Sequence, residues 1–341
     1  MENNSCPVCG SKKPVFPCSI CGFEANWDDM EFLKEIDENL YSEMKKSSIS
    51  RYRSKWWENS GFEITTYSNI QLDKYKGTAD TVVIPFGVKK ICLFRGYPEV
   101  DNTTKHIILP DTVTQINGYA FANCTKLESI ELPPVLKELG SGAFSHCSSL
   151  KNCSLPTGIT IIPESLFYNC TKLRKVTFAG LIYKISEGAF SGCRSLGKIE
   201  LPDTVEEIGA KAFWECGSIR QITIPENVLR IEESTFWFCY NLAKAIMPNS
   251  LQSIGENAFE NCEKLNSIVL PKQLKSIGKR AFRATDLYEI YIPRSVTTIG
   301  EEIFDRCHNL KFIYCEASEK PAGWHENWIG EHCRPLVIWN S

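Results

Sequence analysis

Four cysteines near the beginning of the sequence have the types and spacing of a metal site. Cys6 and Cys9 form one C-x2-C-G pair, and Cys18 and Cys21 form a second pair after eight intervening residues. Two residues between cysteines allow both sulfurs to reach one ion, and the glycine after each pair permits a tight turn. Four thiolates in a tetrahedron favour Zn²⁺. We therefore predict one structural zinc ion, whose filled coordination sphere leaves no position for a catalytic water.

Other interpretations of these cysteines are iron of the rubredoxin type, a redox-active C-x-x-C pair and a metal-free loop. A redox pair normally occurs singly and in a βαβ context, which this stretch of sequence does not provide. Because so short a segment has almost no apolar core, we expect its folding to depend on the metal.

The following segment, residues 24–66, is predicted to be a helical connector, and it has the period of an amphipathic helix from Trp27 to Trp57. Met30, Leu33 and Met44 lie on one stripe, which predicts one or two helices that connect the zinc site to the rest of the chain and cap it. The first half of this segment is acidic and the second half is basic, as the helix dipole favours. The basic half also carries aromatic residues, so contact with nucleic acid and an oligomerisation helix are alternative interpretations.

The remainder of the sequence repeats one unit, with the template A-F-x-x-C-x-x-L-x-x-I-x-L-P. Its phenylalanine recurs every 23 residues, with one last spacing of 22, at Phe121, Phe144, Phe167, Phe190, Phe213, Phe236, Phe259, Phe282 and Phe304. A fixed period of this length marks a solenoid, in which each unit buries its apolar face by stacking on its neighbours. We predict an α/β-type solenoid over residues 67–315, followed by a C-terminal cap over residues 316–341.

Each position of the template has a predicted place in the coil. The Leu-x-x-Ile-x-Leu positions predict a strand with alternating inward and outward side chains, and the proline ends it because it lacks an amide donor. The Ala-Phe pair is predicted to lie on a short helix with its phenylalanine in the core. The recurrent cysteine, for example Cys216, is predicted to be a packed free thiol. Disulfides or a metal ladder are the alternatives.

The overall composition gives no global sign of a nucleic-acid or membrane partner. The 341 residues include 38 basic and 41 acidic side chains, for a formal net charge of −3. No stretch reaches the roughly 18 apolar residues of a membrane span, and the first residues have neither a basic region nor an apolar run. We therefore expect a cytoplasmic protein with reduced thiols.

The template resembles the repeats of the BspA-type leucine-rich repeat family, and the resemblance covers residues 67–341. The stretch Val82-Val-Ile-Pro85 is similar to that family's entry repeat, and residues 316–341 resemble its C-terminal cap. The first segment resembles the short zinc ribbons of many bacterial proteins, so residues 1–23 are predicted to form one. Membership of the repeat family implies protein recognition and, for many members, adhesion at the cell surface.

Solenoids usually bind on their sheet face, where two side chains per unit are predicted to point outward. On early units these side chains are polar, whereas on later units they become apolar and aromatic. The predicted partner-binding residues, on a concave sheet face, are Ile246, Val269, Tyr291, Phe312 and Tyr314. Clustered exposed aromatics are typical of a site for a protein or peptide. The alternative is that the capping segment folds over these residues and buries them.

Catalytic motifs are absent from the sequence. It contains no P-loop, G-x-G-x-x-G, G-x-S-x-G or H-E-x-x-H motif, and its five histidines are scattered. His325, His332 and Cys333 are candidates for a second metal site. We therefore predict a non-enzymatic protein-recognition scaffold with structural zinc. The alternatives are a zinc-ribbon regulator that contacts nucleic acid and a surface adhesion protein of the BspA type.

Overall fold

The computed structural model describes residues 62–65, 71–84, 87–93 and 103–340 of the chain. The predicted zinc ribbon, with Cys6, Cys9, Cys18 and Cys21, lies outside these residues, and so do the helices predicted after it.

Most repeat units form one coil with two short strands, because alternating apolar residues bury every second side chain of each strand. The units that contain Lys198 and Ser267 have a strand in the second ladder alone. Strands at equivalent positions of successive coils pair in parallel and form two ladders, in which pairing is interrupted between some coils. In the first ladder Val176 pairs with Cys153, and in the second ladder Ile254 pairs with Ile277. Each pairing therefore joins equivalent positions of neighbouring units.

The strands divide between the two ladders. The first ladder contains β3 (Thr81–Val83), β5 (His106–Ile108), β7 (Ser129–Glu131), β9 (Asn152–Leu155), β11 (Lys175–Phe178), β14 (Gln221–Thr223), β16 (Lys244–Ile246), β19 (Glu289–Ile292), β21 (Phe312–Cys315) and β22 (Leu336–Trp339). The second ladder contains β2 (Gln71–Tyr75), β4 (Lys90–Ile91), β6 (Gln115–Ile116), β8 (Glu138–Leu139), β10 (Ile161–Ile162), β12 (Lys184–Ile185), β13 (Glu207–Ile208), β15 (Arg230–Ile231), β17 (Ser253–Ile254), β18 (Ser276–Ile277) and β20 (Thr298–Ile299). β1 (Phe62–Thr65) pairs antiparallel with β2 at the N-terminal end of the second ladder.

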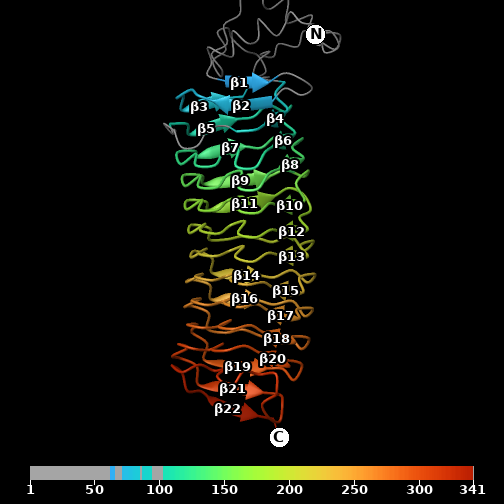
Figure 1. The fold of residues 1–341 in the computed structure, drawn as a ribbon, viewed down its shortest axis with the longest axis vertical. Coiled ribbons are helices and arrows are strands. Elements are labelled where there is room, and N and C mark those ends of the chain that lie inside the picture. The colour runs from blue at the N-terminus through green and yellow to red at the C-terminus, as the bar shows by residue number, and fades with distance from the viewer. Residues whose placement is uncertain (1–61, 66–70, 85–86, 94–102, 341) are drawn as a thin grey trace, which may run out of the picture.

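The described coils stack into a long column. Figure 1 shows them one above the other, with β1 at one end and β22 at the other, and the stack is almost straight in this view. The sequence predicts a concave sheet face, and the structure does not show one.

The third side of the coil, which contains the Ala-Phe pair, is a run of turns and not the predicted short helix. Two positions per unit, two residues before and two after the phenylalanine, have positive φ, as at Tyr119 (57°) and Asn123 (61°). A right-handed helix cannot continue through residues in this conformation. Alternate amides instead bond to the next coil, and the Phe121 N–H donates to the Ala143 carbonyl at 2.8 Å. We call this side the turn stack.

The α/β-type prediction is therefore wrong for this side of the coil, and the fold is a β-solenoid with no helix among the described residues. Residues that tolerate positive φ occupy several of the turn-stack positions, namely Asn123, Gly142, Asn169, Gly188, Gly192, Asn257 and Asn261. Neighbouring coils also approach closely beside the turn stack. A Cβ atom on Gly140 would lie 2.1 Å from the backbone nitrogen of Gly118 in the preceding coil.

The core is a row of stacked phenylalanine rings, one per coil, which we call the phenylalanine row. All nine are fully buried, and successive ring centroids from Phe121 to Phe304 lie 5.2 to 6.0 Å apart. Neighbouring rings are nearly parallel, and the angle between Phe213 and Phe236 is 3°. The row holds consecutive coils at a constant spacing, including those between which strand pairing is interrupted. The predicted core position of the phenylalanine is confirmed.

The recurrent cysteines form a second buried row, which we call the cysteine row. Each is a free thiol, and most donate to the carbonyl of a phenylalanine in the preceding coil, as Cys216 Sγ does to Phe190 O at 3.1 Å. The Phe190 carbonyl also accepts the backbone N–H of Cys193 at 3.1 Å, so the thiol of the next coil supplies the second hydrogen bond of this carbonyl. The prediction of packed thiols is confirmed.

The C-terminal segment adds one more coil to the column. Trp324 and Trp328 are buried against the end of the core, and the Trp324 indole N–H donates to Val296 O at 3.0 Å. The ring centroids of Trp328 and Phe304 lie 6.2 Å apart, so the tryptophan takes the place of the next phenylalanine. β22 then pairs with β21 as a further strand of the first ladder.

A search for membrane spans among the described residues finds no helix with the length and hydropathy needed to cross a bilayer.

Candidate protein-interaction surface

The predicted partner-binding residues lie together on the outward face of the first ladder, near its C-terminal end. Side chains of a strand alternate between its two faces, so the residues that flank a buried position point outward. Ile246 ends β16, Val269 follows an isolated bridge at Ser267, and Tyr291 lies on β19. Phe312 and Tyr314 lie on β21. The repeat therefore brings residues up to 68 positions apart in the sequence (246 to 314) onto consecutive coils.

Three of these residues are strongly exposed for apolar side chains. Their exposed fractions are 83% for Val269, 58% for Tyr291 and 37% for Ile246, whereas Phe312 and Tyr314 are half-buried. The inward neighbour Ile268 is 8% exposed. The contrast between adjacent residues shows that the core of these coils is complete without the outward side chains.

The aromatic members pack against one another along the column. Tyr291 and Tyr314 stack with centroids 4.5 Å apart and an interplanar angle of 12°. Phe312 lies between Tyr314, at 6.1 Å, and Tyr288, at 6.0 Å. Partial burial and the neighbouring Tyr291 raise the pKa of the Tyr314 hydroxyl above its ordinary value. A tyrosine hydroxyl is already uncharged at neutral pH, and the raised pKa keeps Tyr314 uncharged to a higher pH.

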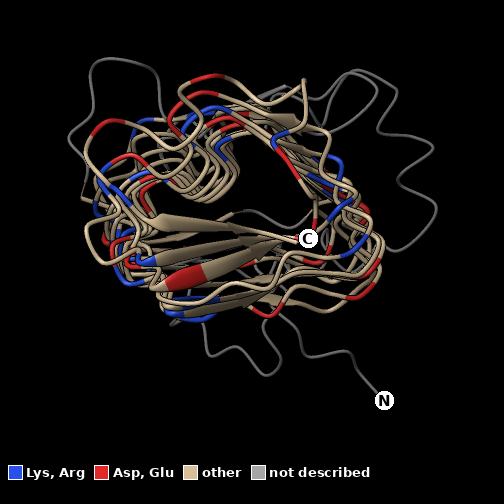
Figure 2. Cartoon of the chain, turned by 90° about the horizontal axis from the view of Figure 1, so that it is seen from below, with Lys and Arg blue, Asp and Glu red and all other residues tan. Residues whose placement is uncertain are grey.

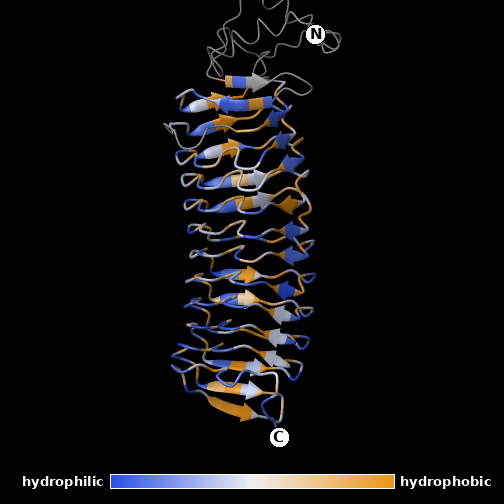
Figure 3. Cartoon of the chain, in the orientation of Figure 1, coloured by the Kyte–Doolittle hydropathy of each residue, from blue (hydrophilic) through white to orange (hydrophobic). Residues whose placement is uncertain are grey.

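The C-terminal segment does not cover these residues, so the alternative interpretation is wrong. β22 lies beside β21, with Phe312 opposite Leu336 and Tyr314 opposite Ile338. Leu336 is 60% exposed and Ile338 is 37% exposed, and Figure 3 shows hydrophobic colours on β21 and β22. The segment therefore enlarges the apolar surface. We call the whole set the apolar stripe: Ile246, Val269, Tyr291, Phe312, Tyr314, Leu336 and Ile338.

Sequence reasoning missed Leu336 and Ile338 because the last coil lacks the Ala-Phe-x-x-Cys template. A signal for them was present. Pro335 precedes four consecutive apolar residues, Leu336, Val337, Ile338 and Trp339, and the last three are of types with strong strand propensity. Spacing also supports the assignment, since Leu336 follows Phe312 by 24 residues, close to one repeat.

The second metal site considered at His325, His332 and Cys333 is not formed. His332 Nδ1 lies 2.8 Å from Asp305 Oδ1, and Cys333 Sγ donates to Phe304 O at 3.1 Å. His325 Nδ1 accepts a bond from the backbone N–H of Asn327. Within the described ranges, no group of three His, Cys, Asp or Glu side chains is placed to hold a metal ion.

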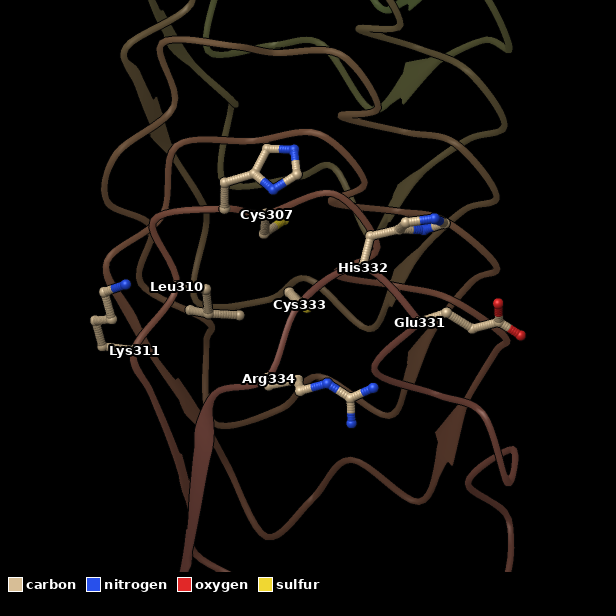
Figure 4. A pocket seen from close by; sticks show the side chains of 8 residues that line it. Cys307, Leu310, Lys311, Glu331, His332, Cys333 and Arg334 are labelled. Atoms are coloured by element: carbon tan, nitrogen blue, oxygen red, sulfur yellow. The ribbon is translucent and has the colours of Figure 1, made fainter.

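A hollow beside these residues also lacks the chemistry of an active site. Figure 4 shows its lining: Cys307, His308, Leu310, Lys311, Glu331, His332, Cys333 and Arg334. Burial raises the pKa of Cys307 to about 11 and that of Cys333 to about 12. Both thiols are therefore protonated at neutral pH and are poor nucleophiles. Nothing in the described part of the chain points to catalysis.

The repeats of this chain match the profile of a known family. The profile described as "BspA type Leucine rich repeat region" matches in six copies over residues 100–216 and 183–311, which together span more than half of the chain. The chain belongs to the BspA-type leucine-rich repeat family. A search of the curated proteins finds no match to this chain.

Solved structures similar to this chain come from several bacteria. A leucine rich cell surface protein from Faecalibacterium prausnitzii is 23% identical, with 82% of this chain and 93% of that chain covered and a TM-score of 0.46. A leucine-rich repeat protein from Bacteroides ovatus is 21% identical, with coverage of 82% and 98% and a TM-score of 0.46. The pneumococcal vaccine antigen PcpA is 18% identical, with coverage of 74% and 85% and a TM-score of 0.48.

Proposed function

We propose that this BspA-type protein is a non-enzymatic scaffold that recognises another protein or a peptide on the apolar stripe. The observation that supports this function is the exposure of Val269 and Tyr291 on coils whose core is already complete. Clustered apolar side chains of this kind are costly to expose unless they serve an interaction. Aromatic residues are also enriched at the centres of protein interfaces.

The chemistry of the face favours protein recognition over the binding of a small molecule. Small ligands are usually bound in concave pockets, and the hollow in Figure 4 is lined by none of the stripe residues. Members of the stripe extend over consecutive coils, each about 4.8 Å from the next, so they offer several separate anchors along one line. An extended or helical segment of a partner can contact such a line.

A double variant tests the proposal. Proteins captured from the native host by the full chain are identified, and the affinity of each purified candidate is measured for wild type and for Tyr291→Ala with Phe312→Ala. We expect the double variant to bind at least about 10-fold more weakly, which corresponds to about 1.4 kcal/mol. Its thermal unfolding should match that of wild type within a few degrees.

A matched control lies on the second ladder, where Tyr183 and Leu229 are also exposed, by 42% and 46%. Tyr183→Ala with Leu229→Ala removes one aromatic and one aliphatic side chain from a different face. The control should leave the affinity unchanged. Equal losses in both double variants, or no loss in either, would contradict a binding site on the apolar stripe.

The zinc ion and the cytoplasmic location stay predictions. One zinc per chain is expected in purified full-length protein, held by Cys6, Cys9, Cys18 and Cys21. Metal analysis by mass spectrometry of wild type and Cys9→Ser checks this. A zinc-to-protein ratio near zero in wild type, or an unchanged ratio in the variant, would rule the site out.

A further inference from the structure

A group of basic side chains occupies the same outward face, immediately before the apolar stripe. Its members are Arg174, Lys175, Arg220 and Lys244, which we call the basic region, and all four are exposed. No ion pair involves any of them within the part of the chain that the structure describes. Their charges are therefore available to a partner.

Several basic residues near this region are neutralised, which sets the four apart. Lys198 lies 2.6 Å from Glu200, and Lys151 lies 2.6 Å from Glu128. Seen along the column, basic and acidic residues are distributed around the circumference (Figure 2). The overall charge of the chain is close to balanced, so this local excess of positive charge is not a consequence of composition.

The basic region and the apolar stripe form one continuous surface. Lys244 and Ile246 are the two outward residues of the same strand, β16. Arg220 immediately precedes β14, which pairs with β16. Arg174 and Lys175 lie two coils earlier, and the phenylalanine row keeps those coils in the same stack, with 5.4 Å between the rings of Phe190 and Phe213.

The length of this combined surface fits a short extended segment. From the coil of Lys175 to that of Tyr314 there are six steps of about 4.8 Å, or roughly 29 Å. An extended chain of about nine residues covers that distance. One half of such a segment would meet positive charge, and the other half would meet apolar and aromatic side chains.

We propose that the partner of the apolar stripe is a protein segment with two parts, an acidic part and an apolar or aromatic part. This inference rests on the proposed function, since it names the class of segment that the same face binds. Carboxylates of the segment pair with the basic region, and its apolar side chains pack on Val269, Tyr291 and Tyr314. Exposed charges of this kind mainly govern the rate and the specificity of association.

Nucleic acid fits this face less well than an acidic segment. Phosphates continue along the whole length of a nucleic acid, whereas the basic region occupies one part of this face, and beyond Lys244 the exposed Lys311 lies next to the apolar Phe312. Tyr291 and Tyr314 stack on each other, so neither presents two free faces to a base. A segment with a limited acidic part matches the limited extent of the basic region.

A displayed peptide library tests the proposal and requires no identified partner. Random 12-residue peptides on phage are selected on the immobilised full chain, and the enriched peptides are synthesised and measured by fluorescence anisotropy. We expect enrichment of sequences with Asp or Glu on one side and aromatic or aliphatic residues on the other. Their affinity should fall when the NaCl concentration rises from 50 to 300 mM, because exposed charges are screened by salt.

Two charge variants identify the surface involved. The first variant replaces the four basic residues (Arg174→Glu, Lys175→Glu, Arg220→Glu, Lys244→Glu). It should lower the affinity for the selected peptides at least 10-fold and abolish the dependence of that affinity on salt. A milder set with Gln at the same four positions serves if the Glu variant unfolds at a lower temperature than wild type. The matched control reverses the charge of two exposed lysines beside the second ladder, with Lys137→Glu and Lys275→Glu. This variant should bind the peptides as wild type does.

The possible failures separate the two proposals. One outcome is that the selected peptides lack acidic residues, bind the Tyr291→Ala with Phe312→Ala variant more weakly than wild type, and bind the charge variants as tightly as wild type. This outcome would overturn the inference and leave the proposed function intact. Failure to obtain any peptide that depends on Tyr291 and Phe312 would overturn both. A gel-shift assay with a 20-nucleotide RNA measures whether the face binds the phosphates of a nucleic acid instead. Binding that depends on the basic region and not on the aromatic pair would reassign the face to nucleic acid.

Discussion

The phenylalanine row and the outward face of the first ladder belong to the same coils, yet only the row keeps its residue type along the column. Each of the nine buried positions is phenylalanine. The outward position two residues after the start of each first-ladder strand changes from Thr177 through Thr223 to Ile246, Tyr291 and Tyr314. Packing fixes the first set because every ring contacts its two neighbours. On the outward face the residue type varies, and the ring contact of Tyr291 with Tyr314 joins two coils only.

This difference separates residues that form the solenoid from residues that give it a specific use. A change in the interior should alter stability in whichever coil it occurs. A change on the outward face should alter stability little and should alter binding according to its coil.

The cysteine row should produce the largest effect, at alkaline pH. Burial raises the pKa of thiols such as Cys147 and Cys193 well above the ordinary value, so the unfolded chain ionises first. Each protonated, buried thiol therefore stabilises the folded chain in full below the unfolded pKa of about 8.5. This stabilisation is lost as the pH rises through the higher folded pKa. Each thiol should reduce the free energy of unfolding by about 1.4 kcal/mol per pH unit in that window.

Urea unfolding from pH 7 to pH 11 measures this effect. Cys193→Ala serves as a comparison, because it should show a shallower pH dependence than wild type. A urea midpoint that stays constant over the alkaline range would mean that the thiols are not held protonated in the folded column.

Truncation of a ring in the phenylalanine row should produce the next largest effect. Phe213 is fully buried between Phe190 and Phe236, with ring centroids 5.4 and 5.5 Å away. Phe213→Ala removes both contacts and leaves a cavity, so the free energy of unfolding should fall by about 3 to 5 kcal/mol. Chemical denaturation measures the loss, and wild-type stability would contradict the assignment of the row to the core.

A β-branched residue in the turn stack should have an intermediate effect. Asn257 has a φ of 54°, a conformation that costs an ordinary L-residue about 1 to 2 kcal/mol. Asn257→Val should lower the free energy of unfolding by that amount, whereas Asn257→Gly should be nearly neutral. If valine and glycine gave the same stability, this side of the coil would not require the left-handed conformation.

Polar substitution on the apolar stripe should have the smallest effect on stability. Val269 is 83% exposed and its neighbour Ile268 is 8% exposed. Val269→Ser should change the free energy of unfolding by less than about 0.5 kcal/mol, while Ile268→Ser should lower it by at least about 2 kcal/mol. Thermal unfolding of the pair is a direct comparison of the two faces of one strand, and a similar loss in both variants would mean that the stripe is part of the core.

The sequence was sufficient to predict the period, the core residues and the strand phases, because each depends on side chains that repeat. It did not reveal the turn stack, since the Ala-Phe pair also fits a short helix. The choice between the two depends on amides bonding to the next coil, as Phe121 does to Ala143. That contact exists only after the coils have stacked, so no local pattern encodes it.

The candidate surface was predicted in part for the same reason. Ile246, Val269, Tyr291, Phe312 and Tyr314 occupy outward template positions and could be read from the repeat. Whether they are exposed depended on the path of the last coil, which follows no template. The basic region was overlooked because its residues look like ordinary solvated positions until the stack places them in line with the stripe.

The constant spacing of the phenylalanine row has a consequence for how such proteins diversify. Because each coil contacts its neighbours alike, a gene duplication or deletion of one 23-residue unit between Arg220 and Ile246 would leave every interior contact type in place. It would move Arg174, Lys175 and Arg220 away from Lys244 and the apolar stripe, or toward them, by one coil, about 4.8 Å. The distance between the two halves of the face can thus evolve in discrete steps, independently of the residues that compose them.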